Sequence, residues 1–338
     1  MRVAACVSLL LLLLACDAHA ESARDYLGSI RPSPELQKFL DHSIDELMAT
    51  DPKLRHTNLR IALLDMSHGD PPLLAQYHGE TPVYPASVVK FVYLMAAYAW
   101  QEQGKLQIDG ELDDQLTHMI YESSNQATQR VFARVTETEP GPDLPPDAYR
   151  VFRERRLSVK RWLQTLGIDD LHCVNPTYDG DGDLVGRDKQ FLKDRSVEGG
   201  LPSKGDEFPN RQAMTAVGTA KLLALLATDR ALSAQSSAIV RRRMRRDPTE
   251  QPHLVHRIAG GAAGLPDLEV YSKSGTWGPI YADAGIIRRG SGAQFILVVF
   301  TDSNPPYRGD FIAELTHRCA VHLLAEPGGR SAPPSMNE

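Results

Sequence analysis

The chain has 338 residues, of which 42% are hydrophobic and 24% charged, and its formal net charge is −6. This is an ordinary globular composition that allows one large domain or two smaller ones. The mildly acidic balance excludes the strongly basic class and gives no reason to expect nucleic acid as a partner. The arginine-rich run over 241–246 is more typical of a solvated helix face than of a polyanion site.

The N-terminus has the pattern of a secretory signal. A positive residue precedes an apolar run that is too short to span a membrane, and small residues, Ala18 and Ala20, follow it. Cleavage after Ala20 is the preferred interpretation, with a signal peptide over 1–20. In the alternative, the stretch LLAC resembles a lipoprotein box that would leave Cys16 lipidated. Either interpretation predicts a periplasmic or secreted protein without a membrane span.

Apolar periodicity and turn signals predict a series of elements. Strands over 59–66 and 73–79 form a hairpin, and a long apolar helix begins at Ala86. Further helices are predicted over 111–135, 148–166, 211–227, 234–247 and 310–324, and three strands over 268–275, 281–289 and 293–302.

Two stretches lack such periodicity. Residues 136–147 form a loop rich in proline and acid, and the long stretch from there to Asn210 is rich in Gly, Asp and Pro after one helix. Such a long connection is either functional or partly disordered. The tail over 326–338 is expected to be disordered.

Strands at both ends with helices between them predict an α+β fold. The N- and C-terminal segments, 21–86 and 253–325, would form one antiparallel sheet flanked by helices. An all-helical subdomain over 87–252 would be inserted between them.

The stretch YPASVVKFVYLMAAYAW places a lysine, Lys90, in an otherwise apolar helix. A buried ammonium is costly unless it loses its charge or finds partners. Ser87 lies one helical turn before it, so its hydroxyl and the lysine amine share a face. A desolvated lysine can take the serine proton as a general base, and a serine at a helix start offers its N–H to an oxyanion.

Two further motifs follow in the chain, Ser123-Ser124-Asn125 and Lys273-Ser274-Gly275. Together with Ser87-x-x-Lys90, this order and context resembles the class A β-lactamases and penicillin-binding serine hydrolases. The hairpin before Ser87 and the last strand and turn are also similar to that family. The resemblance covers most of the mature chain and is weakest over 136–210.

The resemblance implies a role for each matching residue. Ser87 would be the acylated nucleophile, Lys90 its base or relay, and Ser123 the group that passes a proton to the departing nitrogen. The remaining residues would bind substrate: Asn125, Lys273, Ser274, Gly275 and Thr276. The backbone N–H of Thr276 would complete the oxyanion hole with that of Ser87. No cofactor is implied.

The chain departs from the family pattern in three respects. No clean copy of the Glu-x-x-Leu-Asn element is present, whose glutamate activates the deacylating water. Glu198, followed by Gly-Gly-Leu-Pro, is the nearest candidate, and Glu207 is a second. Ser124 replaces the usual aspartate, and the interval from Ser87 to Ser123 is shorter than is typical. Acylation therefore looks intact, and fast turnover on β-lactams is the part in doubt.

Metal sites and a disulfide have weaker support. The acidic run over 179–183 lacks the glycine and the glutamate of an EF-hand, which favours a mobile acidic loop, and the histidines lack zinc spacing. No metal is therefore expected. In the mature chain, Cys173 and Cys319 could form a disulfide or remain two buried thiols.

These patterns predict an exported serine hydrolase that cleaves β-lactam-type amides through a Ser87 acyl-enzyme, and so a contribution to antibiotic resistance. The first alternative is a D-alanyl-D-alanine peptidase or another serine acyl hydrolase of the same fold. The second is a penicillin-binding sensor that deacylates slowly. The expected partner is a small molecule, a β-lactam or a peptidoglycan-like amide, and the expected state is a monomer.

Overall fold

The computed structural model describes residues 20–67, 69, 71–180, 184–203, 207–290 and 292–324. Three expectations fall largely outside these residues: the signal peptide with its alternative lipid anchor at Cys16, most of the acidic run 179–183, and the tail 326–338. A helix over 20–29 opens the described part. No helix in the described ranges is long and apolar enough to cross a membrane.

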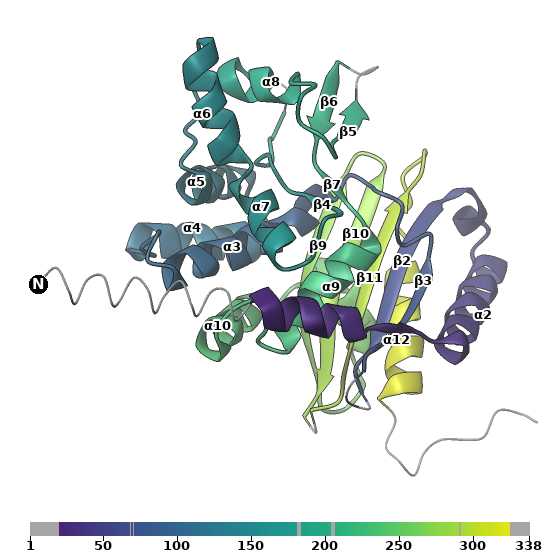
Figure 1. The fold of residues 1–338 in the computed structure, drawn as a ribbon. Helices are drawn as coiled ribbons and strands as arrows, with labels where there is room; N and C mark the ends of the chain where they lie inside the picture. The colour runs from purple at the N-terminus through teal and green to yellow at the C-terminus, as the bar shows by residue number, and fades with distance from the viewer. Residues whose placement is uncertain are drawn as a thin grey trace, which may run out of the picture.

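A seven-stranded sheet forms the centre of the molecule (Figure 1). All neighbouring strands are antiparallel except the first pair, which is parallel. In spatial order the strands are β1 (Arg31–Pro32), β3 (Leu73–Tyr77), β2 (Asn58–Asp65), β11 (Gln294–Asp302), β10 (Ile280–Arg289), β9 (Leu268–Trp277) and β8 (Arg245–Arg246). The predicted joining of the N-terminal hairpin and the C-terminal strands into one sheet is confirmed.

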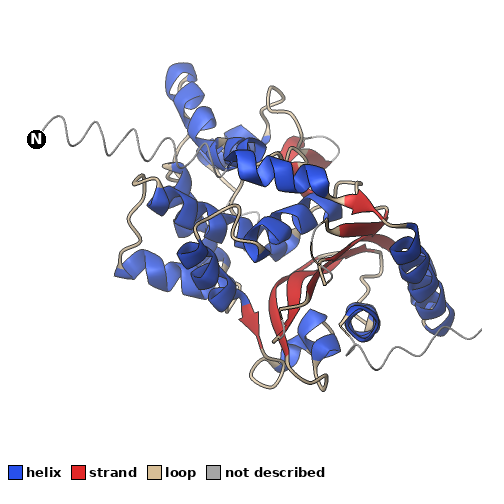
Figure 2. Cartoon of the chain, turned by 60° about the horizontal axis from the view of Figure 1, so that its bottom comes forward, coloured by secondary structure: helices blue, strands red, loops and turns tan. Residues whose placement is uncertain are grey.

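The strand β11 shows why the sheet lacks polar and apolar alternation. Its residues are buried from Phe295 to Thr301, because helices cover both faces of the sheet (Figure 2). Leu297 lies opposite Leu63 of β2 and belongs to one hydrophobic core. Its neighbour Val298 belongs to the other core, so successive side chains fill opposite layers.

Different helices cover the two faces. One layer is built from α2 (Pro34–Thr50), α11 (Ile258–Ala262) and α12 (Phe311–Leu323). The opposite layer contains α9 (Ala216–Ala227) and the nucleophile helix α3 (Lys90–Glu102). The sheet edge at β9 therefore meets the start of α3, and this junction positions the site.

Five of the remaining helices gather beside the sheet and form a helical body (Figure 1). They are α4 (Gly110–Ile120), α5 (Asn125–Thr136), α6 (Pro146–Arg156), α7 (Ser158–Thr165) and α8 (Gly186–Leu192). A further helix, α10 (Ala234–Met244), lies apart from α5 to α8 and packs mainly against β9, α3 and α9. Single-turn 3-10 helices occur at η1 (Pro52–His56), η2 (Ala86–Val89) and η4 (Pro252–Leu254).

The region 87–252 is not entirely helical. Two short two-stranded sheets lie within it, β4 (Leu171–His172) with β7 (Ala213–Met214) and β5 (Leu201–Ser203) with β6 (Phe208–Arg211). Strands of two to four residues carry no detectable periodicity, so the sequence could not predict them. The division into two subdomains stays a prediction.

The single helix predicted over 111–135 is two helices, because the chain turns at Ser123. This residue has a left-handed φ of 60°, which a continuing helix does not allow. The hydroxyl of Ser124 then caps α5 by accepting the Ala127 N–H at 3.2 Å. The turn between α4 and α5 therefore holds Ser123 in a fixed position.

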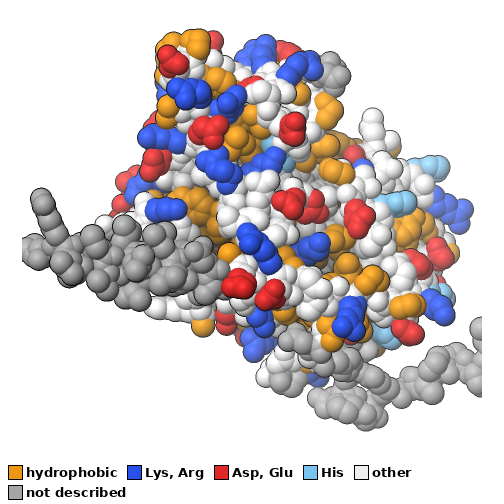
Figure 3. Space-filling model, in the orientation of Figure 1, with side chains coloured by type: hydrophobic (Ala, Val, Ile, Leu, Met, Phe, Trp, Pro, Cys, Tyr) orange, Lys and Arg blue, Asp and Glu red, His pale blue; other side chains and the backbone are white. Residues whose placement is uncertain are grey.

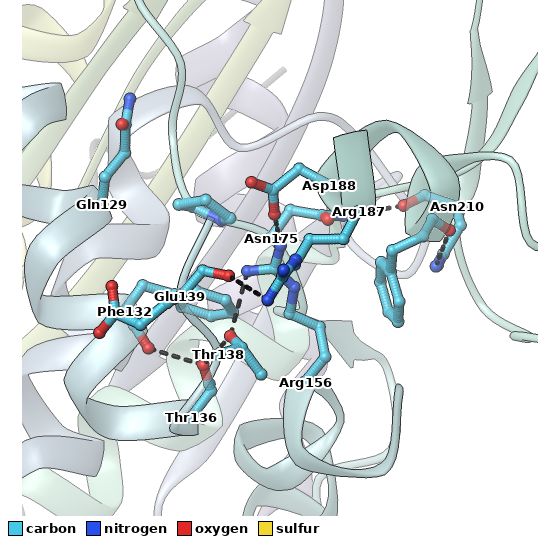
Figure 4. Close-up of polar contacts among 12 residues, drawn as sticks. Gln129, Phe132, Thr136, Thr138, Glu139, Arg156, Asn175, Arg187, Asp188 and Asn210 are labelled. Atoms are coloured by element: carbon cyan, nitrogen blue, oxygen red, sulfur yellow. Dashed lines mark hydrogen bonds and ion pairs between the residues drawn. The ribbon is translucent and has the colours of Figure 1, made fainter. Parts of the chain in front are cut away.

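The long segment, residues 171–214, runs from β4 to β7 and carries α8. Its anchor is a buried ion pair between Asp188 of α8 and Arg156 of α6, whose exposed fractions are 4% and 2%. Figure 4 shows these two side chains pointing toward each other, with Thr138 beside the guanidinium.

Three aromatic rings surround this ion pair. Their centroids lie 4.8 to 5.6 Å from the Arg156 guanidinium, and the rings belong to Phe132, Phe152 and Phe191. Phe152 and Phe191 also form a small separate core with Val174 and Val197. The long segment is thus attached to the helical body through its own core.

Two smaller expectations can be compared with the structure. Cys173 and Cys319 are both buried free thiols, so they form no disulfide. The arginine run is only partly a solvated face, because Arg246 is buried and donates to the carbonyls of Ile120 and Ser272. Elsewhere, Figure 3 shows acidic and basic side chains interspersed over the visible face.

Candidate active site

Ser87 lies in the 3-10 turn η2, directly before α3. The preceding Ala86 has a left-handed φ of 48°, a conformation that non-glycine residues adopt rarely and mostly at functional sites. Ser87 is partly exposed, and its hydroxyl makes no hydrogen bond to any residue in the described ranges. The hydroxyl is therefore available to a substrate.

Lys90, one turn later, is completely buried. Its ammonium donates to the Ser123 carbonyl at 2.5 Å and to Asn125 Oδ1 at 2.7 Å. Burial lowers its pKa from 10.5 to about 7, although Asp179 acts in the opposite direction. A substantial fraction of Lys90 is consequently a neutral amine near neutral pH, as a general base requires.

Ser123 connects the two lysines of the site. Its hydroxyl accepts from Lys273 at 2.9 Å and lies 3.4 Å from the Lys90 amine. Both of these lysines are buried, so the Ser123 hydroxyl sits between two nitrogens that can exchange protons with it. Residues of all three motifs therefore meet at Ser123.

Lys273 enters the site from β9. Its pKa lies well below the ordinary value because of burial first, and then because of the charges of Lys90 and Arg246. The next residues, Ser274 and the exposed Thr276, continue along the strand. β8 pairs with β9 only at Val270 and Tyr271, so the edge of β9 from Lys273 onward is not covered by β8 and lies against η2.

Gly275 allows β9 to approach the nucleophile turn. A Cβ at this position would lie 2.8 Å from the Pro85 carbonyl oxygen and 3.0 Å from the Ser87 nitrogen. Such contacts are too close, so only glycine lets the strand and the turn share this space. The close approach brings the Ser87 N–H beside Gly275, the residue before Thr276.

Buried cations gather beneath β9, and the sequence did not indicate them. Arg257 donates to Thr276 Oγ1 at 2.5 Å and to two backbone carbonyls. Arg246 lies on the other side of the strand end, and Asp283, completely buried, is the nearby acid. Burial raises the pKa of Asp283, while Arg257 lowers it. This arrangement favours a bound anion next to Thr276.

A carboxylate that motif reasoning missed reaches the site from the long segment. Asp179 accepts from Asn125 Nδ2 at 2.8 Å, and Asn125 in turn accepts from Lys90. The only signal in the sequence was the acidic run that Asp179 opens. Asp179 does not match the Glu-x-x-Leu-Asn pattern, so the resemblance to the family did not indicate it.

The two glutamate candidates lie elsewhere on the long segment. Glu198 is exposed, and its carbonyl accepts from Lys160 of α7 at 2.6 Å. Glu207 pairs with Lys193 at 3.2 Å on the surface. Neither carboxylate contacts Ser87, Lys90 or Ser123 among the residues that the structure describes.

Several solved structures of known proteins share this fold. A beta-lactamase from Sphaerobacter thermophilus matches with 17% identity and a TM-score of 0.58, over 86% of this chain and 98% of that chain. A beta-lactamase from Streptosporangium roseum matches with 14% identity and a TM-score of 0.59, over 84% and 98%. PBP-A matches with 15% identity and a TM-score of 0.58, over 88% and 98%. These identities show the fold alone.

No curated protein sequence matches significantly. The family model described as "Beta-lactamase enzyme family" matches residues 155–323, which is half of the chain and includes Lys273. Ser87 and Lys90 lie before the matched residues, in the part that the solved structures cover. The chain therefore belongs to the beta-lactamase enzyme family and is a serine β-lactamase-like hydrolase.

Proposed function

We propose that this protein is an exported enzyme that opens β-lactam-type amides through an acyl-enzyme on Ser87. The observation that carries the proposal is the buried Lys90 amine. Its pKa of about 7 makes it a base at neutral pH, one helical turn from an unengaged serine hydroxyl.

Acylation would proceed in three proton transfers. The Ser87 oxygen attacks the amide carbonyl while its proton passes to the neutral Lys90 amine, and the N–H groups of Ser87 and Thr276 stabilise the oxyanion. The carbon–nitrogen bond then breaks, and the leaving nitrogen takes a proton from the Ser123 hydroxyl. Ser123 regains a proton from Lys90 or Lys273, both within hydrogen-bond reach.

The substrate carboxylate would bind at the open edge of β9. Lys273, Ser274 and Thr276 supply donors there, and Arg257 holds the Thr276 side chain at 2.5 Å. The buried charges of Arg246 and Arg257 add a positive field beneath the strand. Gly275 keeps this edge close to Ser87.

For deacylation we propose that Asp179 positions and activates the water. It is the carboxylate that contacts Asn125 and influences Lys90, whereas Glu198 and Glu207 have surface partners. The side chain of aspartate is one methylene group shorter than that of the family's glutamate, so its carboxylate extends less far toward the acyl-enzyme. Slow deacylation, and hence a penicillin-binding sensor, is the second candidate function on this observation.

The test is the intact mass of the protein against time after mixing with a penicillin and with a cephalosporin. A transient adduct with product formation supports a β-lactamase, and a persistent adduct supports the sensor or a peptidase-like enzyme. Ser87→Ala should abolish the adduct, and labelling that persists would refute the nucleophile assignment. Asp179→Asn should prolong the adduct, while Glu198→Gln and Glu207→Gln serve as matched controls.

We also propose export, on the basis of the N-terminal pattern. The intact mass of protein recovered from a bacterial host distinguishes the alternatives: a mature chain that begins at Glu21, a lipidated Cys16, or an unprocessed chain. The third result would contradict export. We further propose a periplasmic location and a role in antibiotic resistance, both of which depend on export. A monomeric state is a separate proposal.

A further inference from the structure

A cavity of about 340 Å³ lies between the residues before η2, the end of β9 and the long segment. Its walls are mainly aromatic and aliphatic, with a single arginine among the residues that line it. The lining residues that matter here are Tyr84, Tyr178, Leu192, Phe208, Arg211 and Trp277. A cavity of this size holds a substituted aryl group, and apolar walls with few polar groups are typical of ligand sites.

The position of the cavity in the sequence connects it to the reaction. Tyr84 lies three residues before Ser87, and Trp277 directly follows Thr276 of the proposed oxyanion hole. Tyr178 directly precedes Asp179. Each of these three wall residues thus lies within three positions in the sequence of a residue that is proposed to act on the substrate. A group bonded to the acyl side of that carbonyl can enter the cavity without leaving the site.

Arg211 is held in a fixed orientation between two rings. Its guanidinium lies 4.3 Å from the Tyr84 centroid and 5.1 Å from the Trp277 centroid. The rings themselves are 5.3 Å apart and inclined by 67°. Such stacking orients a guanidinium in advance, and Arg211 also donates a hydrogen bond to the Tyr84 hydroxyl, which leaves its remaining N–H groups for a planar anion. Within the described ranges, no carboxylate forms an ion pair with Arg211.

Trp277 supports a ligand on this wall. It is 49% exposed, and it follows the exposed Thr276 at the end of β9. Arg211 covers one part of the ring, and the remainder faces solvent. A second aromatic group in the cavity would cover this surface.

We propose that the cavity binds the acyl side chain of the substrate, and that Arg211 is a specificity-determining residue for acyl groups that combine an apolar, aryl-sized body with a terminal carboxylate. This inference rests on the proposed acyl-enzyme function of Ser87. The preferred substrates are therefore dianions. One carboxylate binds at Lys273 and Thr276, and the other binds at Arg211 on the opposite side of the scissile amide.

The test compares two penicillins that differ only in the charge of the side chain. One carries a 4-carboxyphenylacetyl group and the other its neutral 4-carbamoyl counterpart. The second-order rate of adduct formation is measured by intact mass, so deacylation does not enter. A charge-assisted hydrogen bond predicts that the wild-type protein prefers the carboxylate by about tenfold or more.

Variants assign the preference to Arg211. The ratio of the two rates should fall close to one in Arg211→Gln and remain partly above one in Arg211→Lys. Arg195→Gln is the matched control, because Arg195 is exposed on the same segment and does not line the cavity. It should leave the ratio unchanged.

The outcomes separate the two proposals. A wild-type ratio near one, or a preference that survives Arg211→Gln, overturns the side-chain assignment while leaving the acyl-enzyme intact. A preference lost equally in Arg195→Gln shows a general charge effect and also overturns it. No adduct with either penicillin refutes the proposed function on which the inference rests.

Discussion

Replacing Lys90 by methionine should change how the stability of the protein depends on pH. Burial lowers the pKa of Lys90 from 10.5 to about 7, a depression whose full cost is about 5 kcal/mol when the amine is protonated. Between these two values the unfolded chain binds a proton that the folded chain does not. The unfolding free energy of the wild type therefore rises with pH in this window, by about 2 kcal/mol from pH 7 to pH 9.

Lys90→Met removes this titration but keeps an unbranched apolar side chain. It also leaves the Ser123 carbonyl and Asn125 Oδ1 without their donor, at a cost of about 1–3 kcal/mol each. For this reason the pH dependence, and not the stability at one pH, is the informative quantity. Loss of the Lys90 charge also raises the pKa of Lys273 toward its ordinary value. This change further reduces the pH dependence of the variant's stability relative to that of the wild type.

The assay is urea unfolding of the wild type and the variant at pH 7 and pH 9, followed by tryptophan fluorescence. The wild type should gain about 2 kcal/mol or more relative to Lys90→Met across this range. Lys105→Met, which removes an exposed lysine, is the control and should follow the wild type. Equal pH dependence in all three proteins would show that Lys90 keeps its ordinary pKa, and the proposed base would lose its physical basis.

Three other changes test separate parts of the structure. The acylation rate of the wild type should rise with pH to a plateau above the Lys90 pKa of about 7, and a rate that falls over this range would contradict an amine base. Asp188→Asn leaves the buried Arg156 charge unpaired and should lower the unfolding free energy by about 3–5 kcal/mol in urea, whereas a change within error would mean that the ion pair is not an anchor. Gly275→Ala should slow acylation at least about tenfold by displacing the Ser87 turn, and an unchanged rate would show that the strand can move away.

Much of the fold could be predicted because its signals are local. The strand β11 is an apolar run bounded by turn residues, and the helix α3 is an almost continuous apolar stretch. Two joined helices over 111–135 could not be distinguished from one, because the break depends on the left-handed conformation of Ser123. The short strands β4 to β7 depend on tertiary contacts and leave no pattern.

The residues of the site also differ in how far the sequence could predict them. Ser87, Lys90, Ser123 and Lys273 stand in short motifs, and the structure brings them into one hydrogen-bonded group. Arg257 and Asp179 stand in no motif, because their roles arise from contacts with residues distant in the chain. A lone arginine or aspartate in a loop is indistinguishable from a surface charge until the fold is known.

The separate core of the long segment has an evolutionary consequence. Ser87, Lys90, Ser123 and Lys273 lie on the sheet and on the helices beside it, whereas Asp179 and Arg211 lie on a segment with its own buried anchor. Away from the positions that contact the site, such as Asp179, substitutions in that segment can accumulate while Ser87, Lys90, Ser123 and Lys273 keep their places. Lineages with this architecture could diverge in turnover and in substrate range while inheriting the same acylation chemistry, so the segment is where selection would act first.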